Sequence, residues 1–307
     1  MKKVKLFHND SALHRLNYRI NDTTIFMKRD DVLDFAMGGN KVRLYEYIAG
    51  KIEEANVERV VTFGSKYSNF LRVTAAVCSK LNIPCDLIVL DDDHKYSGGN
   101  EILIGYHKAN ILHCRIEDAH EFIDVYQKQL ETQGVKYIWI PGGGHMPEAG
   151  FAYNEVIKSL YADGSIQNNQ IDAIFVPCGT GTSQAGIIYG NEDRAVKIYG
   201  VTIARPIERC ISEIDTILNG MSCIEGKEHQ EHEINVIESG IRNYGEINDV
   251  IEGVIEEIAV SDGIYLDPIY NAPAFHGMRC FLKSHQEYKN VIYINTGGVP
   301  NVFLNKE

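Results

Sequence analysis

Short apolar, β-branched runs alternate with helix-period segments along most of this sequence of 307 residues. Strands that are apolar throughout and alternate with helices form parallel sheets covered on both faces. The sequence therefore predicts an α/β fold with open, twisted, mainly parallel sheets. The predicted strands are 59–64, 84–90, 135–141, 172–178, 197–204 and 290–295. The predicted helices are 68–81, 99–109, 119–133, 149–161 and 249–260.

Composition narrows the class of protein. With 44% apolar residues the chain can bury a large core, and its length suits two domains or one two-lobed unit. The formal charge of -12 argues against a nucleic-acid partner, because such binding needs clustered cations. No run approaches about 18 apolar residues, and the N-terminal MKKVKLFHND lacks the apolar stretch of a signal peptide. We expect a soluble cytoplasmic protein without a membrane partner.

The sequence argues against a catalytic metal site and against a disulfide framework. The seven cysteines form no C-x-x-C pair and are odd in number, which indicates free thiols in a reducing compartment. The eleven histidines show no H-x-x-x-H spacing with a third ligand, so we expect no catalytic metal. The acidic run 91–93 beside His94 and the polar stretch 219–233 are interpreted as solvated surface segments.

The stretch MGGNKV places Lys41 directly after two glycines and an asparagine, where a helix begins. The simpler interpretation is a solvated cation in the first helical turn. The alternative is a lysine whose amine a carbonyl compound can reach.

The segment VPCGTGTSQAG leads from a predicted strand into a helix whose N-cap we expect at Thr182 or Ser183. Small residues and a helix N-terminus can hold a phosphate without a lysine. Cys178, at the end of this strand, is expected to be a buried small apolar residue. Glycine turns also follow the strands at 135–141 and 290–295, and ligands of parallel sheets bind at the carboxyl ends of strands. These loops either meet at one site or are separate turns.

An ordered set of motifs resembles D-cysteine desulfhydrase and 1-aminocyclopropane-1-carboxylate (ACC) deaminase. The motifs are KRDD, GGNKVRLYEY, YSNFLR, GGNEILIGYHKANI, PGGGHMPEAGFAY, CGTGTSQAG, LDPIYNAPAFHGM and INTGG. The similarity extends over nearly the whole chain. It implies a pyridoxal 5'-phosphate (PLP) enzyme of the tryptophan-synthase-like fold, with a smaller domain of residues 47–160 inserted into a larger one made of 1–46 and 161–307. A homodimer is a further expectation from the resemblance.

The resemblance also assigns roles to individual residues. Lys41 matches the Schiff-base lysine, and Asn69 matches the residue that bonds the pyridine 3'-oxygen. Tyr270 matches the tyrosine of the D-P-x-Y motif, and in an elimination Ser68 and Tyr270 would serve as proton donors or acceptors or orient the substrate. The phosphate loop matches Gly179, Thr180, Gly181 and Thr182, Thr296 lies near the pyridine ring, and the substrate side of the site includes Tyr67, Ser68, Asn69, Tyr244 and Tyr270. For Ser68 an N-cap is an alternative role, and for Tyr270 simple packing is another.

Three departures from the family pattern concern the substrate. Tyr67 and Phe70 replace polar residues that normally help to bind the substrate carboxylate, and Lys66 adds a nearby cation. Asn271 stands where ACC deaminases carry a glutamate, so opening of a cyclopropane ring is doubtful. We expect α,β-elimination and deamination of a small amino acid to a keto acid and ammonia. A β-replacement synthase, a racemase and a non-catalytic PLP or amino-acid binding protein are the alternatives.

Overall fold

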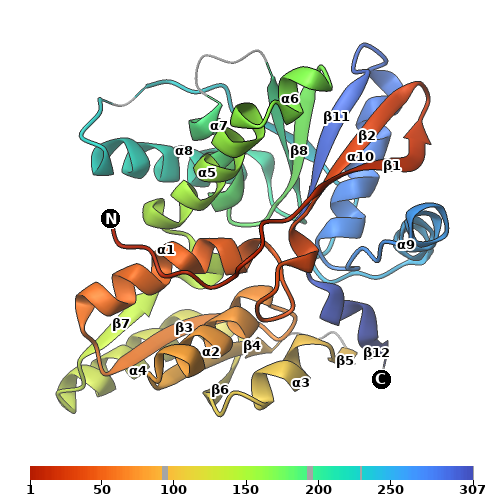
Figure 1. Ribbon diagram of the computed structural model, residues 1–307. Coiled ribbons are helices and arrows are strands. Elements are labelled where there is room, and N and C mark those ends of the chain that lie inside the picture. The colour runs from red at the N-terminus through yellow and green to blue at the C-terminus, as the bar shows by residue number, and fades with distance from the viewer. Residues whose placement is uncertain (92–95, 192–195, 229, 307) are drawn as a thin grey trace.

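The structure is a computed structural model that describes residues 1–91, 96–191, 196–228 and 230–306. Figure 1 shows a larger sheet above and a smaller sheet below, with α1 (Asn40–Ala55) lying between them. The α/β fold predicted from the sequence is confirmed.

The larger sheet has the strand order β1-β2-β11-β8-β9-β10. Every neighbouring pair in it is parallel except β1 and β2, which form an antiparallel hairpin at the edge. The strands are β1 (Leu13–Ile20), β2 (Thr23–Arg29), β8 (Ala173–Cys178), β9 (Lys197–Thr202), β10 (Asn235–Glu238) and β11 (Asn290–Asn295).

Alternate residues of a strand point to opposite faces of the sheet, and the central strand of the larger sheet is apolar on both faces. Helices therefore cover both faces. In β8, Ile174 and Val176 join the core under one group of helices, whereas Ala173 and Phe175 join the core on the other face. The first group comprises α5 (Pro147–Ala162), α6 (Ser165–Asn168), α7 (Thr182–Gly190) and α8 (Ile207–Ile224). The other face carries α9 (Asp249–Asp262) and α10 (Asn271–Ser284).

The smaller sheet is parallel throughout, with the order β6-β4-β3-β7. Its strands are β3 (Arg59–Ser65), β4 (Cys85–Asp91), β6 (Asn110–Arg115) and β7 (Tyr137–Ile140). It packs with α2 (Asn69–Leu81) and α4 (Ala119–Thr132), and α3 (Asn100–Gly105) packs against α2. Outside both sheets, β5 (Tyr96–Gly98) pairs with β12 (Leu304–Lys306). The 3-10 helices are η1 (Asp30–Val32), η2 (Ile116–Asp118), η3 (Gly142–Gly144) and η4 (Val299–Phe303).

All six predicted strands are present, but several details were wrong. The helix expected at 99–109 ends at Gly105, and β6 follows it. The stretch 219–233 is not all surface, because α8 continues to Ile224 and buries Met221 completely. The residue before α7 is Gly181 in a left-handed conformation, so the helix begins at Thr182 without a side-chain cap. Most of the acidic run 91–93 and His94 lie outside the described residues.

The domain boundaries at 47 and 160 stay a prediction. The strands β3, β4, β6 and β7 lie inside that range. Helix α1 begins before it, and α5, which closes it, packs against α7 and α8 of the larger sheet. Across the described ranges, no helix is both long and apolar enough to cross a bilayer.

Candidate active site

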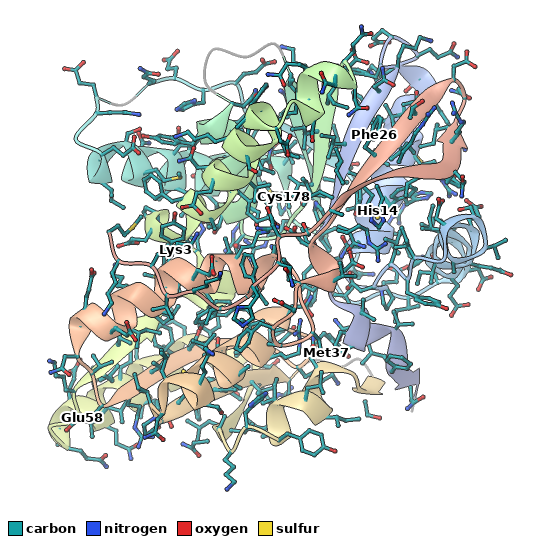
Figure 2. All side chains as sticks on the ribbon, viewed as in Figure 1. Lys3, His14, Phe26, Met37, Glu58 and Cys178 are labelled. Carbon is teal, nitrogen blue, oxygen red and sulfur yellow. The ribbon has the colours of Figure 1, made fainter. Side chains whose placement is uncertain are left out.

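A cavity of about 380 Å³ lies between the two lobes. Its walls come from segments that follow the carboxyl ends of β3, β7, β8, β9 and β11, so both parallel sheets contribute. Figure 2 labels Cys178, the last residue of β8, near the middle of the molecule, where it is buried as the sequence predicted. The separate glycine loops of the sequence therefore meet at one site, as expected for ligands of parallel sheets.

Lys41 projects into this cavity from the first turn of α1. Its Nζ donates a hydrogen bond to the Gly143 carbonyl oxygen at 2.9 Å. Burial, followed by the charge of Arg205, lowers the pKa of Lys41 to about 8. A larger fraction of this amine is uncharged near neutral pH than of a solvated lysine, which suits a nucleophile or a base.

Two glycine turns fix the start of α1. Gly39 has a φ of 101°, and a Cβ at this position would lie 2.7 Å from the Thr296 carbonyl oxygen. The next residue, Asn40, donates its backbone N–H to the same oxygen at 3.0 Å. Only glycine allows this approach, so the turn after β11 determines where α1 begins and hence where Lys41 lies.

A buried ion pair holds α1 from its other side. Arg43 contacts Asp30 through two hydrogen bonds of 2.8 and 2.9 Å and also pairs with Asp10. Tyr153 of α5 donates to Asp30 at 2.5 Å. Burial would raise the pKa of Asp30, but Arg43 outweighs it and keeps this pKa below its usual value. Sequence reasoning missed this anchor, although both residues lie in motifs that carried the resemblance.

The loop after β8 brings Gly179 and Thr180 to the cavity wall. Gly181 and Thr182 of the same predicted phosphate loop lie behind them. A Cβ on Gly181 would meet Ile214 at 2.6 Å, and Thr182 is 1% exposed and donates to the Gly144 carbonyl oxygen. Gly179 and Thr180, which line the cavity, thus directly precede the amino terminus of α7 in a tightly packed turn, an arrangement that suits an anionic phosphate.

In the loop after β3, consecutive residues differ in whether they face the cavity. Ser68 and Asn69 line the cavity, whereas Tyr67 is 1% exposed and is not part of the lining. Ser68 caps α2, because its Oγ accepts the backbone N–H groups of Phe70 and Leu71 at 3.2 and 3.3 Å. The Oδ1 of Asn69 accepts from Asn100 at 2.9 Å.

Three hydroxyl groups form a chain across the cavity. The Tyr244 hydroxyl lies 2.5 Å from that of Tyr270 and 3.0 Å from Ser65 Oγ at the end of β3. Burial, followed by the neighbouring Tyr244, raises the pKa of Tyr270 well above its usual value. Tyr270 therefore stays protonated at neutral pH and keeps an O–H that can donate a hydrogen bond to a ligand.

Asn271 holds the turn at Thr296 and Gly297 in place through buried hydrogen bonds. Its completely buried amide donates to Asp267 at 2.7 Å and to the Gly297 carbonyl oxygen at 2.5 Å. Its Oδ1 accepts the Thr296 backbone N–H at 3.0 Å. Thr296 itself lines the cavity, so Asn271 fixes the turn that presents it.

Sequence reasoning also missed Arg205, which lines the cavity after β9. The available signal was a cation that directly follows a predicted strand, at the edge where ligands bind.

The side chains in this cavity fit PLP. A lysine with a lowered pKa lies on one wall, and a helix N-terminus with small residues lies on another. Bound to the lysine, the cofactor supplies an electron sink that acidifies the α-carbon of an amino acid.

Comparison with known proteins agrees with this assignment. The family model described as "Pyridoxal-phosphate dependent enzyme" matches residues 6–297. A putative 1-aminocyclopropane-1-carboxylate deaminase of Pyrococcus abyssi is 26% identical over 290 residues, which cover 91% of this chain and 86% of that protein. The D-cysteine desulfhydrase of Serratia proteamaculans is 25% identical over 315 residues, covering 98% and 95% of the two chains. The crystal structure of an ACC deaminase homologue has a TM-score of 0.89 at 23% identity, with 98% of this chain and 93% of that one covered. The chain belongs to the pyridoxal-phosphate dependent enzymes.

Proposed function

We propose that this enzyme catalyses α,β-elimination and deamination of a small amino acid with a leaving group on its β-carbon. The products are a keto acid and ammonia. One observation carries the proposal: Lys41, with its lowered pKa, shares a cavity with the Tyr244 and Tyr270 hydroxyl pair. A base and a proton donor are the two groups that such an elimination needs.

Each residue has a defined task in this proposal. Lys41 would hold the cofactor through Nζ, and the same Nζ, once free, accepts the α-proton. The β-substituent leaves with the electrons of its bond to carbon and takes a proton from Tyr270. The α-proton held on Lys41 then passes through water and Tyr244 to Tyr270, so that both residues return to their starting states. Hydrolysis by water then completes deamination. Ser68 orients the substrate beside these groups, and Tyr67 shapes this wall from behind.

The cofactor-binding roles follow the loops around the cavity. The backbone N–H groups of Gly179, Thr180, Gly181 and Thr182 would bind the phosphate. Asn69 would bond the 3'-oxygen, and Thr296 would contact the pyridine ring. These assignments come from the resemblance and are supported by the meeting of the loops at one cavity.

Ring opening of an ACC-like substrate is not favoured by Asn271. This side chain makes buried hydrogen bonds to Asp267 and the Thr296–Gly297 turn and carries no carboxylate. We therefore place the activity closer to that of the D-cysteine desulfhydrase relatives than to the deaminase relatives.

The first experiment is the visible absorption spectrum, followed by borohydride reduction and peptide mapping. We expect a yellow protein with the cofactor fixed on Lys41, and no fixation in Lys41→Ala. Lys51→Ala is the matched control, because Lys51 lies on the same helix but pairs with Glu148 outside the cavity. A colourless protein that takes up no PLP would exclude the proposal.

Substrate is then identified by screening D- and L-amino acids, with keto acid and ammonia as readouts. Formation of a new amino acid when thiols are added would indicate β-replacement instead. Interconversion of enantiomers without ammonia would indicate a racemase.

We also infer a homodimer, as the resemblance implies, and a cytoplasmic location, as expected from the apolar pattern of the sequence. Light scattering of the purified protein tests its oligomeric state, and fractionation of the producing cells tests its location.

A further inference from the structure

The cavity contains an arginine to which none of the roles above applies. Among the described residues that line it, Lys41 and Arg205 are the only cationic side chains. Lys41 is committed to the cofactor and the α-proton in the proposed function, on which this inference rests. A second cation at the same site therefore needs a role of its own.

The backbone at Arg205 is held in one conformation. Thr202 Oγ1 donates to the Arg205 carbonyl oxygen at 2.9 Å and accepts its backbone N–H at 3.3 Å. Ala204 has a φ of 54°, a left-handed conformation that is uncommon for a residue with a Cβ. Pro206 follows and α8 begins one residue later. Such conformations persist where surrounding structure enforces them, as at ligand sites.

The charge of Arg205 has no carboxylate partner in the part of the chain that the structure describes. The nearby Glu213 pairs with His145 at 2.8 Å and with Arg209 at 3.7 Å instead. Arg205 is only partly exposed, and its charge acts on Lys41 and Tyr270 across the cavity. A half-buried cation without a counterion leaves room for an anion supplied by a ligand.

The opposite wall offers no comparable group. Phe63, Phe70 and Leu90 make it apolar, and Phe70 stacks on Tyr45 with ring centroids 5.2 Å apart. Ser68 Oγ accepts two backbone N–H groups there and can still donate its own O–H. Among the described residues that line this wall none is cationic, so a substrate carboxylate would meet only neutral donors there.

We propose that Arg205 binds the α-carboxylate of the amino-acid substrate, so that the substrate is held from the larger lobe. The planar fork of a guanidinium matches the two oxygens of a carboxylate, and such paired bonds are stronger than neutral ones. Every amino acid carries this group, so Arg205 is a positioning residue for the whole substrate class.

The test compares a carboxylate with its amide in the holoenzyme. Exchange of the α-proton in deuterated water is measured for each enantiomer of alanine and of alaninamide, with wild type, Arg205→Gln and Arg205→Lys. We expect Arg205→Gln to lower kcat/KM for alanine about 30-fold or more, mainly through KM, which corresponds to about 2 kcal/mol. Alaninamide should change only by the smaller factor that the altered pKa of Lys41 brings to both substrates, and Arg205→Lys, which keeps the charge, should restore part of the loss. Arg209→Gln is the control, because Arg209 is exposed on α8.

A second readout does not depend on turnover. Propionate, which has the carboxylate but no amine, should bind the wild-type holoenzyme in a thermal-shift titration and lose about 30-fold in affinity in Arg205→Gln. Equal loss for alanine and alaninamide would overturn the inference, as would weaker binding of PLP alone. So would a loss confined to amino acids with a second acid group. If wild type exchanges no α-proton at all while propionate binding still depends on Arg205, the proposed elimination fails and the carboxylate site stands.

Discussion

Replacing Asn271 by aspartate should cost far more stability than the exchange of one atom suggests. The amide donates to Asp267 and to the Gly297 carbonyl oxygen inside the protein. Aspartate at neutral pH has no hydrogen to donate, so the Gly297 carbonyl oxygen loses this donor and Asp267 loses one of the several donors that it accepts. Each such loss costs about 1–3 kcal/mol.

The new carboxyl group has one way to reduce this cost, which is to bind a proton. Burial already raises the pKa of Asp267, so a second carboxylate 2.7 Å away would share a proton with it. Holding a proton at pH 7 on a group with an ordinary pKa near 3.9 costs about 4 kcal/mol, since each pH unit contributes about 1.4 kcal/mol. We expect Asn271→Asp to lower the free energy of unfolding by about 3–5 kcal/mol at pH 7.

The pH dependence has a definite sign. The native variant binds a proton that the unfolded chain releases, because the pKa is raised on folding. Stability must therefore fall as pH rises, and the deficit should shrink by about 2–3 kcal/mol between pH 7 and pH 5.

Urea unfolding followed by circular dichroism at both pH values measures this deficit. The control is Asn110→Asp, because Asn110 also donates to a buried aspartate, Asp86 at 3.0 Å, but is itself exposed. We expect it to cost less than about 1 kcal/mol at either pH. A deficit below about 1 kcal/mol for Asn271→Asp, or one that is equal at pH 5 and pH 7, would refute the reasoning.

Three further predictions concern Lys41 and its surroundings. Because burial and then Arg205 lower the pKa of Lys41 to about 8, borohydride-trapped attachment of PLP to Lys41 should reach its half-maximal rate near pH 8, and a midpoint above pH 10 would contradict this. Gly39→Ala should abolish this attachment, since the new Cβ meets a carbonyl oxygen at 2.7 Å, while circular dichroism still reports a folded chain. The control is Gly253→Ala, where the new Cβ meets nothing within 4 Å; it should change neither the attachment nor the spectrum. Asp30→Asn should lower the free energy of unfolding by about 3–5 kcal/mol in urea, because Arg43 loses its completely buried partner and keeps only Asp10, which is half exposed.

The central strands were predictable because their apolar runs are continuous, and β8 is buried at every residue. The edge strand β1 has mostly exposed or partly exposed residues, so its sequence carries little periodic signal. Helix α10 was missed because Pro273 and Gly277 interrupt an otherwise helical pattern. In these places tertiary packing decides the local structure.

In the candidate site, too, some features could be predicted from the sequence pattern and others depend on tertiary packing. Loops rich in glycine were recognised as a group because carboxyl ends of parallel strands meet at one edge. The separation of Tyr67 from Ser68 was not predictable, since it depends on how the turn before α2 directs adjacent side chains. The approach of Arg205 to Lys41 depends on the left-handed conformation of Ala204, which its residue type does not indicate.

The buried pair between Asp30 and Arg43 bears on what happens after each reaction. In the proposed function, Lys41 leaves the cofactor and returns to it in every reaction. With α1 held by Arg43, and through it by Asp10 near the N-terminus, the return requires only rotations about the bonds of one side chain. Such rotations take picoseconds to nanoseconds, far less than a typical turnover. Shortening or altering the N-terminal segment around Asp10 would therefore affect Lys41 indirectly, because α1 would be held less firmly and the position of Lys41 would vary from one reaction to the next.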